Sequence, residues 1–463
     1  MNTANAKFLQ GNLLRHVTVM SLTTSVGLMA VFLVDLVDML FISMLGKEEL
    51  AAAVGYSGAI LFFTTSFGIG MSIAAGALVA QALGEGDEEK ARRRAASSLL
   101  YGFVFASVFS TIVWLNLPYL AGLMGASGET LTLAVHYLRI LIPSLPILLL
   151  GMVGGAILRA HGDARRSMMS TIAGGVANAI LDPILIFGLD LELTGAALAS
   201  VAARCVIAAV ALYPVIRVHR GLSRPHVAQL RVDLTAILAI AGPAILTQLA
   251  TPIGQAYVTR SMASFGEDAV AGMAVVARLT PVAFGAIFAL SGAVGPIIGQ
   301  NFGAGQSTRV RAAFRDALIF TACWVALATV ILFLMRAQIV ALFNVDGMAV
   351  TLIFLFCGPL ALMFFFNGVI FVSNAAFNNL GHPFYSTLIN WGRNTLGTIP
   401  LVWLGALWFG APGVLIGQAF GGVIFAAIAF VLGRRVMAAG ARPVKDTPFA
   451  RQGRLHALLH LRR

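Results

Sequence analysis

Long apolar runs separated by short polar turns make up most of this chain. Runs of about 20 or more apolar residues are long enough to cross a bilayer as helices. Several runs exceed that length, so tilted helices or projecting ends are expected. The pattern predicts an all-α polytopic membrane protein with twelve transmembrane helices. The expected spans are 17–45, 50–83, 95–117, 129–158, 168–189, 194–216, 234–262, 268–302, 310–334, 347–378, 384–408 and 411–433.

The two halves of the pattern repeat at a nearly constant offset. Six helices per half, an even number, give both halves the same orientation, so two six-helix bundles are related by a parallel internal repeat. We expect an N-terminal bundle over 1–216, a cytoplasmic linker over 217–233, a C-terminal bundle over 234–433 and a basic cytoplasmic tail over 434–463. The matched positions are Gln81, Gly84, Gly86 and Gly162 with Gln300, Gly303, Gly305 and Gly381 at offset 219, and 45–52 with 265–272 at offset 220.

Composition supports the membrane class. Of the 463 residues, 59% are hydrophobic and 11% are charged, and the mean hydropathy is +0.89, which excludes a soluble globular protein. The net charge of +12 would suggest nucleic acid in a soluble protein. Here the lysines and arginines concentrate at the N-terminus, in alternate loops and in the tail, so we expect both termini in the cytoplasm and the basic residues at the anionic lipids of the inner membrane, with no nucleic-acid partner.

Nothing in the sequence indicates catalysis. Cys205, Cys323 and Cys357 fall in apolar spans and suggest no disulfide, metal site or redox role. There is no phosphate-binding loop, no Ser/His/Asp order and no cluster with metal-ligand spacing. We expect no enzyme and no cofactor. Residues 1–16 lead into a long apolar run without a cleavage site, which indicates a retained first helix.

Two carboxyl groups lie inside the first span. An ionised carboxylate at bilayer depth is costly and is usually there for a function. Asp35 and Asp38 are three residues apart, so they share one helix face, and two carboxylates this close do not both ionise easily. We interpret the span as the ion-handling element of a transporter. A pair of interfacial aspartates near a helix end is the alternative.

The segment Asn178–Pro183 carries a second polar group. Asn178 and Asp182 lie four residues apart on one helix face, and Pro183 frees a carbonyl one turn earlier. These oxygens suit a hard monovalent cation, and the carboxylate can instead carry a proton. A kinked helix with a packing asparagine is the alternative. The acidic residues deep inside spans all lie in the first half, because Gln255 and Val258 stand at the positions matching Asp35 and Asp38, so we expect the coupling ion in the N-terminal bundle.

Four short patterns together resemble the MATE family of multidrug and toxic compound extrusion transporters. They are VDxxFxxxLGxxxLAA over 37–52, LRxxGD over 158–163, NxxxDP over 178–183 and GAALAS over 195–200. The resemblance covers all twelve expected helices. It implies a secondary active exporter of small, drug-like, amphipathic and often cationic compounds, driven by H⁺ or Na⁺ antiport through alternating access.

The resemblance also implies a cation site in the N-terminal bundle. By position, Asp38, Asn178, Asp182 and Ser200 would hold H⁺ or Na⁺, with Tyr137 in the same network. Three departures accompany it. Asp35 is an additional carboxylate, which favours H⁺. Gly155 stands near the place of the family's helix-4 amide, and Met20–Ser25 lack the proline that some members use to bend the first helix.

Other polar residues inside spans leave alternatives open. Arg204, Arg278 and Arg393 either screen the aspartates or hold an anionic substrate, or else they reach the interface or form ordinary ion pairs. A set of amides on the seventh and tenth spans, beside the aromatic and Met-rich run 363–366, either lines a substrate cavity or packs helices together. The residues assigned to this cavity are Gln248, Gln255, Asn367, Asn374, Asn378 and Met363.

Rival functions remain. A lipid-linked-precursor flippase of the same superfamily is the first, although such proteins usually have more helices and a strongly cationic cavity. An intramembrane enzyme or a channel is the second, but no histidine or nucleophile accompanies the carboxylates. We expect a chain that functions as a monomer, because both bundles lie within it.

Overall fold

The protein is described by a computed structural model covering residues 6–223 and 227–438, in which every regular element is helical. The helices of the first half are η2 (Lys7–Leu9), α1 (Leu13–Met44), α2 (Glu48–Glu85), α3 (Glu88–Leu115), α4 (Leu117–Leu123), α5 (Gly128–Leu141), η3 (Ile142–Ser144), α6 (Leu145–Ala160), α7 (Ala164–Pro183), η4 (Ile184–Gly188) and α8 (Glu192–Arg217).

The second half repeats this order. Its helices are α9 (Val227–Ala263), α10 (Glu267–Gly303), α11 (Ser307–Phe343), α12 (Met348–Leu355), η5 (Phe356–Leu360), α13 (Ala361–Asn379), α14 (Pro383–Gly392), η6 (Arg393–Gly397) and α15 (Thr398–Ala438). The tail beyond Ala438 lies outside the described residues, and α9 begins inside the stretch assigned to the linker.

Twelve spans follow from eleven apolar helical stretches in the described part of the chain. The last stretch, Pro383–Ala438, has 56 residues, twice what one crossing needs. It turns at Gly410, whose φ of 63° and ψ of −142° suit glycine. On either side of this turn Gly405 and Gly413 pack backbone to backbone, so the stretch is a hairpin of two helices. The predicted fold class is therefore confirmed.

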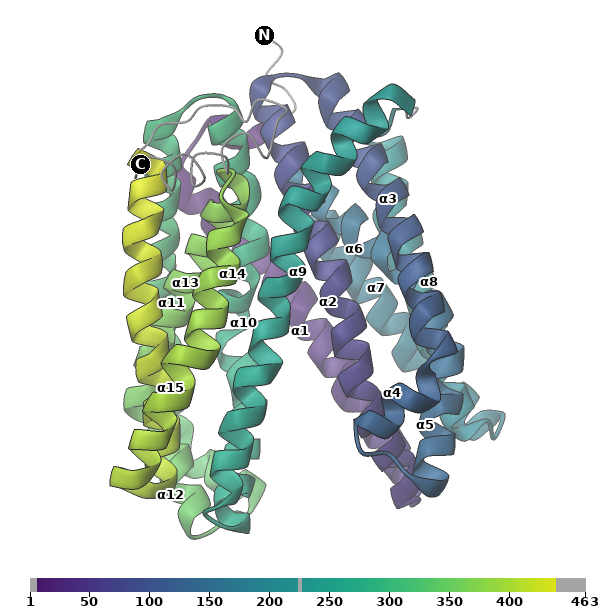
Figure 1. Ribbon diagram of the computed structural model, residues 1–463, viewed down its shortest axis with the longest axis vertical. Coiled ribbons are helices and arrows are strands. Elements are labelled where there is room, and N and C mark those ends of the chain that lie inside the picture. Colours follow the sequence, from purple (N-terminus) through teal and green to yellow (C-terminus); the bar gives the residue numbers. More distant parts are fainter. Residues whose placement is uncertain (1–5, 224–226, 439–463) are drawn as a thin grey trace, which may run out of the picture.

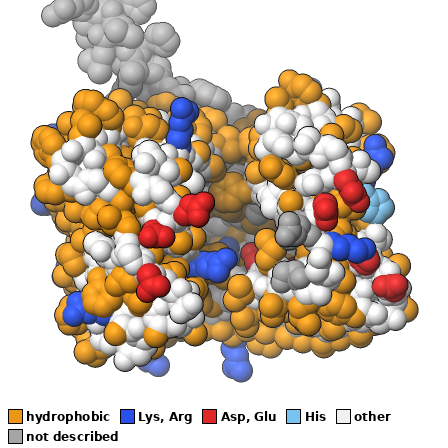
Figure 2. Space-filling view, turned by 90° about the horizontal axis from the view of Figure 1, so that it is seen from below, with side chains coloured by type: hydrophobic (Ala, Val, Ile, Leu, Met, Phe, Trp, Pro, Cys, Tyr) orange, Lys and Arg blue, Asp and Glu red, His pale blue; other side chains and the backbone are white. Residues whose placement is uncertain are grey.

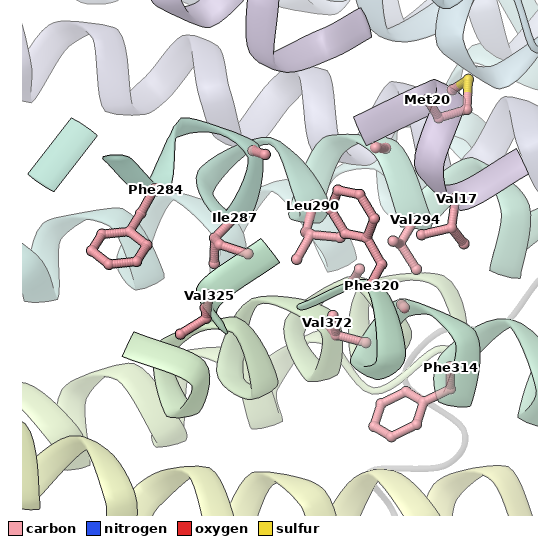
Figure 3. Close-up of a cluster of buried hydrophobic side chains, with 14 of the residues drawn as sticks. Val17, Met20, Phe284, Ile287, Leu290, Val294, Phe314, Phe320, Val325 and Val372 are labelled. Atoms are coloured by element: carbon pink, nitrogen blue, oxygen red, sulfur yellow. The ribbon is translucent and has the colours of Figure 1, made fainter. Parts of the chain in front are cut away.

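The two bundles form a V (Figure 1). The start of α1 and the end of α15 lie at the closed end of the V, which we call the terminal side, and the bundles separate toward the opposite, open side. Helices α1 and α2 of the first bundle pack against α9 and α10 of the second. Figure 3 shows Val17 and Met20 of α1 beside the buried side chains of α10.

Matched contacts close the terminal side, and we call this contact region the seam. A Cβ at Gly84 would overlap the Gln300 carbonyl, and a Cβ at Gly303 would overlap the Gln81 carbonyl. Gln81 Nε2 donates to the Asn379 carbonyl at 2.8 Å, and Gln300 Nε2 donates to the Ala160 carbonyl at 2.8 Å. Every pair is related by the offset of 219 found in the sequence. The repeat is therefore a pseudo-twofold relation between the bundles at this level.

The segment around η2 lies across one half of the seam only. The Phe8 side chain is 1% exposed, and its main-chain N–H donates to Gln300 Oε1 at 2.9 Å. The Phe8 carbonyl accepts from Asn301 Nδ2 at 3.2 Å and from Arg309 Nη2 at 3.0 Å. Lys7 Nζ reaches the Gly162 carbonyl of the first bundle at 3.4 Å. This short segment thus bonds to both bundles.

Three expectations about spans need correction. Helix α11 continues to Phe343, nine residues beyond the expected end, because Arg336 stacks on Phe333 at 4.1 Å and on Phe354 at 4.8 Å and so stays in a helix. The fourth span is broken by η3, where Pro143 and Pro146 lack main-chain donors. The short helix α4 follows the third span, where no element was expected.

Candidate functional site: a carboxylate cluster in the N-terminal bundle

Close packing of α7 between α1 and α8 sets the geometry of the site. A Cβ at Gly175 would meet Val34 Cγ2 of α1 at 2.9 Å, and a Cβ at the neighbouring Gly174 would overlap the Ile207 side chain of α8. Two adjacent glycines therefore let α7 approach both neighbours closely. Polar residues one and two turns further along α7 then face α1 and α8.

The structure brings Asp38 and Asp182 together. Asp182 is fully buried and Asp38 is half-buried, and their side chains lie within hydrogen-bonding reach of one another. Two carboxylates cannot bond because neither has a donor, whereas one proton shared between them forms a bridge. The pair thus needs a proton or another cation to be stable.

Asn178 and Ser200 complete the cluster with Tyr137. Asn178 is 1% exposed and Tyr137 is 6% exposed. Tyr137 shares a side-chain hydrogen bond with Ser200 and interacts electrostatically with Asp38 and Asp182. The side chains of Asp38, Asp182, Ser200 and Tyr137 therefore gather in one place, and Asn178 lies one turn before Asp182 on the same face of α7.

Five buried polar atoms of this cluster have no hydrogen-bond partner within the described chain. Unpaired buried polar atoms are rare and costly, and clusters of them indicate a missing ligand. Carboxylate and amide oxygens are ligands that Na⁺ and a proton can both use. The atoms are Asp38 Oδ1, Asn178 Oδ1, Asn178 Nδ2, Asp182 Oδ1 and Asp182 Oδ2.

The three departures from the family pattern are clear in the structure. Asp35 is exposed on α1 and interacts electrostatically with Asp38, so it lies at the edge of the cluster and outside its buried part. Helix α1 runs from Leu13 to Met44 as one helix. Near Gly155 the space is taken by other side chains, since a Cβ there would meet Ser167 Oγ at 3.1 Å and Arg159 Nη1 at 3.4 Å.

The amides assigned to a substrate cavity divide into two groups. Asn374 and Asn378 are buried between α13 and α14, where Asn390 Nδ2 donates to Asn374 Oδ1 at 3.2 Å and Ser386 Oγ donates to Asn378 Oδ1 at 3.2 Å. These hydrogen bonds favour the packing alternative for both amides.

The remaining members of that set are more accessible. Gln255 is exposed on α9 and accepts from Gln418 Nε2 at 3.3 Å. Gln248, Met363 and Asn367 are half-buried, and Asn367 Oδ1 has no partner among the described residues. Figure 2, which views the molecule from its open side, shows a hollow between the two lobes. Accessible amides beside an apolar wall suit binding of amphipathic molecules.

Ion pairs were one of the alternatives for the intramembrane arginines. Among the described residues, no salt bridge involves Arg204, Arg278 or Arg393. Arg204 instead donates through Nη1 to the Leu141 carbonyl at 2.9 Å and to Ser144 Oγ at 2.8 Å. The break in the fourth span creates this partner, and the apolar pattern of that span gave little sign of it.

One known protein family matches both bundles of this fold. The MatE family model matches residues 24–184 and 243–404, one segment in each bundle. The chain belongs to the MatE family. It is therefore a transporter and not an enzyme, and it is a multi-pass protein of the inner membrane. The two matched segments begin 219 residues apart, the offset of the internal repeat.

Relatives of this MatE chain include transporters of different cargo. A FAD transporter of Shewanella oneidensis is 29% identical over 92% of this chain and 95% of its own length. The multidrug export protein MepA of Staphylococcus haemolyticus is 25% identical over 85% of this chain and 87% of its own. A crystal structure of a mutant of the Vibrio cholerae MATE transporter VcmN has a TM-score of 0.86 and 26% identity, covering 92% of this chain and 97% of that one.

Proposed function

We propose that this MatE protein is a secondary active multidrug exporter in which the carboxylate cluster of the N-terminal bundle binds the coupling cation. The five unpaired buried atoms of Asp38, Asn178 and Asp182 carry this proposal. A bound cation offsets part of the negative charge of the pair and gives its oxygens a partner. The relatives that are multidrug export proteins support the same activity.

Exchange requires that cation and drug stabilise different states of the protein. With the cation bound, the repulsion between the two carboxylates is relieved and the N-terminal bundle closes around the site. With the site empty, the two carboxylates repel each other and favour the open form that accepts substrate. A ligand that bound both states equally would shift nothing, so the difference in affinity drives the cycle.

Both H⁺ and Na⁺ fit the donor set. Asp38, Asp182 and the Asn178 amide supply oxygens, Ser200 adds a hydroxyl, and hard monovalent cations take such ligands. Asp35 favours H⁺, because a third carboxylate beside Asp38 makes proton uptake easier.

Cationic amphipathic compounds are the proposed substrates. The N-terminal bundle places three carboxyl groups at or beside the site, and the accessible residues Gln248, Gln255, Met363 and Asn367 supply apolar area and amides. Apolar contact then gives affinity and the amides give orientation. Both bundles lie in one chain, so a monomer suffices for transport.

Proteoliposomes test this proposal. Efflux of a cationic dye such as ethidium is measured under a pH gradient and, separately, under a Na⁺ gradient. Asp38→Asn and Asp182→Asn should each abolish gradient-driven efflux and leave the fold largely intact, since a buried charge is itself destabilising. Asp35→Asn should retain more activity. Wild-type coupling in the Asp38→Asn, Asp182→Asn double variant would disprove the cation site.

Export of a flavin dinucleotide is a second candidate, because the FAD transporter of Shewanella oneidensis matches the chain nearly end to end. Arg278 is exposed on α10 within a span and has no salt bridge among the described residues, so an anionic cargo has a basic group to meet. The test measures efflux of FAD and of ethidium, each alone and in competition, from the same vesicles. Export of FAD alone would replace the first candidate, and export of lipid-linked sugars alone would favour a flippase.

A further inference from the structure

Arg204 is a charged side chain held at mid-membrane depth. It is the thirteenth residue of α8 (Glu192–Arg217), about 18 Å from the helix start at 1.5 Å per residue, so its head group does not lie at an interface. Its Nη1 instead donates to the Leu141 carbonyl at 2.9 Å and to Ser144 Oγ at 2.8 Å. Arginine at this depth is costly and needs a specific reason.

Both partners of Arg204 belong to the break in the fourth span. At η3 the main-chain N–H of Leu145 donates to the Ile142 carbonyl, a shorter step than in an α-helix, so the Leu141 carbonyl lacks that donor. Pro143 likewise frees the Arg139 carbonyl, which accepts from Trp114 Nε1 at 3.2 Å. Side chains from two other helices therefore cap the broken end of α5.

This cap lies one helical turn from the cation cluster. Tyr137 and Leu141 are four residues apart on α5, and Ser200 and Arg204 are four residues apart on α8, so each pair shares a helix face. Tyr137 bonds with Ser200, and the Leu141 carbonyl bonds with Arg204, at the same sequence separation of 63. Tyr137 also interacts electrostatically with Arg204, Asp38 and Asp182.

We propose that Arg204 is a positioning residue of the cation site, which fixes the broken end of α5 against α8 and supplies a permanent positive charge one helical turn from the contact between Tyr137 and Ser200. The inference rests on the proposed function. The first role keeps the Tyr137 hydroxyl at Ser200. The second concerns charge: the ionised pair Asp38 and Asp182 carries −2, which Arg204 and one bound monovalent cation together balance, while Asp35 lies outside the buried part of the cluster.

Few other charges surround this position. The helices that pack against α8 are α1, α5, α6, α7 and η4. Residues 145–158 of α6 and the whole of η4 contain no ionisable side chain. The acidic groups facing the site are Asp35 and Asp38 of α1 and Asp182 of α7, and α5 contributes Tyr137. Loss of the Arg204 charge would thus leave the cluster with excess negative charge.

Charge replacement in proteoliposomes separates the two roles. Arg204→Lys keeps the charge, Arg204→Gln keeps a hydrogen-bond donor only, and Arg204→Leu keeps neither. We expect gradient-driven ethidium efflux to fall roughly tenfold in kcat for Gln and Leu, with KM for the dye unchanged and with Lys close to wild type. Adding Asp35→Asn to Arg204→Gln removes one negative charge and should restore several-fold of the lost rate.

The outcomes are distinct. Arg139→Gln, which removes an exposed arginine from α5, is the matched control and should transport normally. Wild-type efflux by Arg204→Gln overturns the proposal. Equal losses in Lys and Gln, with no rescue by Asp35→Asn, show a purely structural arginine and also overturn it. If Asp38→Asn and Asp182→Asn keep coupling in the same preparation, the proposed cation site is disproved, and the role of Arg204 at that site is disproved with it.

Discussion

At the scale of single residues, the turn after α6 shows how burial alters a side chain. The His161 ring lies 4.7 Å from the ring of His219, and its Nδ1–H donates to the Ile157 carbonyl at 2.9 Å. Burial, with repulsion from His219, lowers the pKa of His161 to about 4. Burial would raise the pKa of Asp163, but bonds from His219 and Arg166 lower it to about 2.

This turn predicts a loss of stability in mild acid. An unfolded histidine has a pKa of about 6.5, so between about pH 6.5 and pH 4 the unfolded state binds a proton that folded His161 does not. The free energy of unfolding should therefore fall over that range, by at most about 3 kcal/mol. The thermal unfolding midpoint in detergent should therefore be lower at pH 5 than at pH 7.5.

His161→Gln provides the comparison for that measurement. The variant has no group to protonate at this position, so its midpoint should change less between the two pH values. The Asp163 carboxylate stays ionised throughout this range because its pKa is about 2, so it does not contribute to the drop. Identical pH dependence in the variant and the wild type would contradict the assignment.

The sequence predicted which carboxyl groups lie together better than it predicted where the helices end. The family patterns brought Asp38, Asn178 and Asp182 onto facing helices, and the structure places them together. The sequence could not predict the partners of Arg204, because the position of a freed carbonyl depends on the three-dimensional shape of the helix break at a proline. An amide inside an apolar span is equally compatible with packing and with a cavity, so the burial of Asn374 required the fold.

At the scale of elements, the last two spans pack through glycines. Helix α15 turns at Gly410, and beyond the turn a Cβ at Gly413 would overlap the Gly405 carbonyl while one at Gly417 would overlap the Leu401 carbonyl. The two arms therefore touch main chain to main chain over several turns. Small residues at such interfaces allow close helix packing in membranes, where van der Waals contact replaces the hydrophobic effect.

Gly413→Ala tests this packing. The added methyl group meets backbone that cannot rotate away, so the arms must separate and stability should fall by about 2 kcal/mol or more. Gly422→Ala is the control on the same arm, since nothing lies within 4 Å of a Cβ there, and better helix propensity should leave it neutral or stabilise it by up to about 1 kcal/mol. Equal thermal midpoints for the two variants would refute the close contact.

Helix positions followed from the apolar pattern, whereas helix ends and breaks did not. Most expected spans lie within a few residues of the observed helices. The pattern ended the ninth span before Arg336 because it counts a charge as polar, although the guanidinium rests on two phenylalanine rings. It also passed over the break at η3, since Pro143 and Pro146 lie in a continuous apolar run. Compensation by neighbouring helices decides such cases.

At the scale of the whole molecule, the seam fixes which side of the V is closed. Gln81 and Gln300 each donate a hydrogen bond across it to a main-chain carbonyl of the other bundle. Asp233 of α9 is 1% exposed and accepts hydrogen bonds from two residues of α3, Ser97 Oγ at 2.8 Å and Arg93 Nε at 3.3 Å. The η2 segment adds bonds to both bundles on one half of the seam. Opening this side would break all these contacts.

Loosening the η2 segment should open the terminal side. Phe8→Ala with Arg309→Gln removes a buried ring and a charged hydrogen bond, and each such bond is worth about 1.5–3 kcal/mol. Spin labels at Arg165→Cys and Thr308→Cys, exposed residues of the two bundles, should then show a larger fraction of long distances. Arg311→Gln changes an exposed arginine on the same helix and should leave the distribution unchanged.

Membrane orientation is a separate prediction. The basic loops and both ends of the chain should face the cytoplasm, so the open side of the V would face outward. Reporter fusions after Arg435 and within Glu85–Lys90 should both report the cytoplasm. A periplasmic signal from either fusion would contradict the twelve-helix topology with both termini in the cytoplasm.

The matched contacts of the seam also bear on ancestry. Gln81 with Asn379, and Gln300 with Ala160, are one contact made twice by equivalent residues. Two copies of a single six-helix unit, inserted in the same direction, would form the same pair of bonds about a true twofold axis. A homodimer of half-length chains would therefore already have a closed side, and gene fusion would only have to join them. In a single chain each copy is free to diverge, and here the carboxylates of the cluster lie in the first half alone.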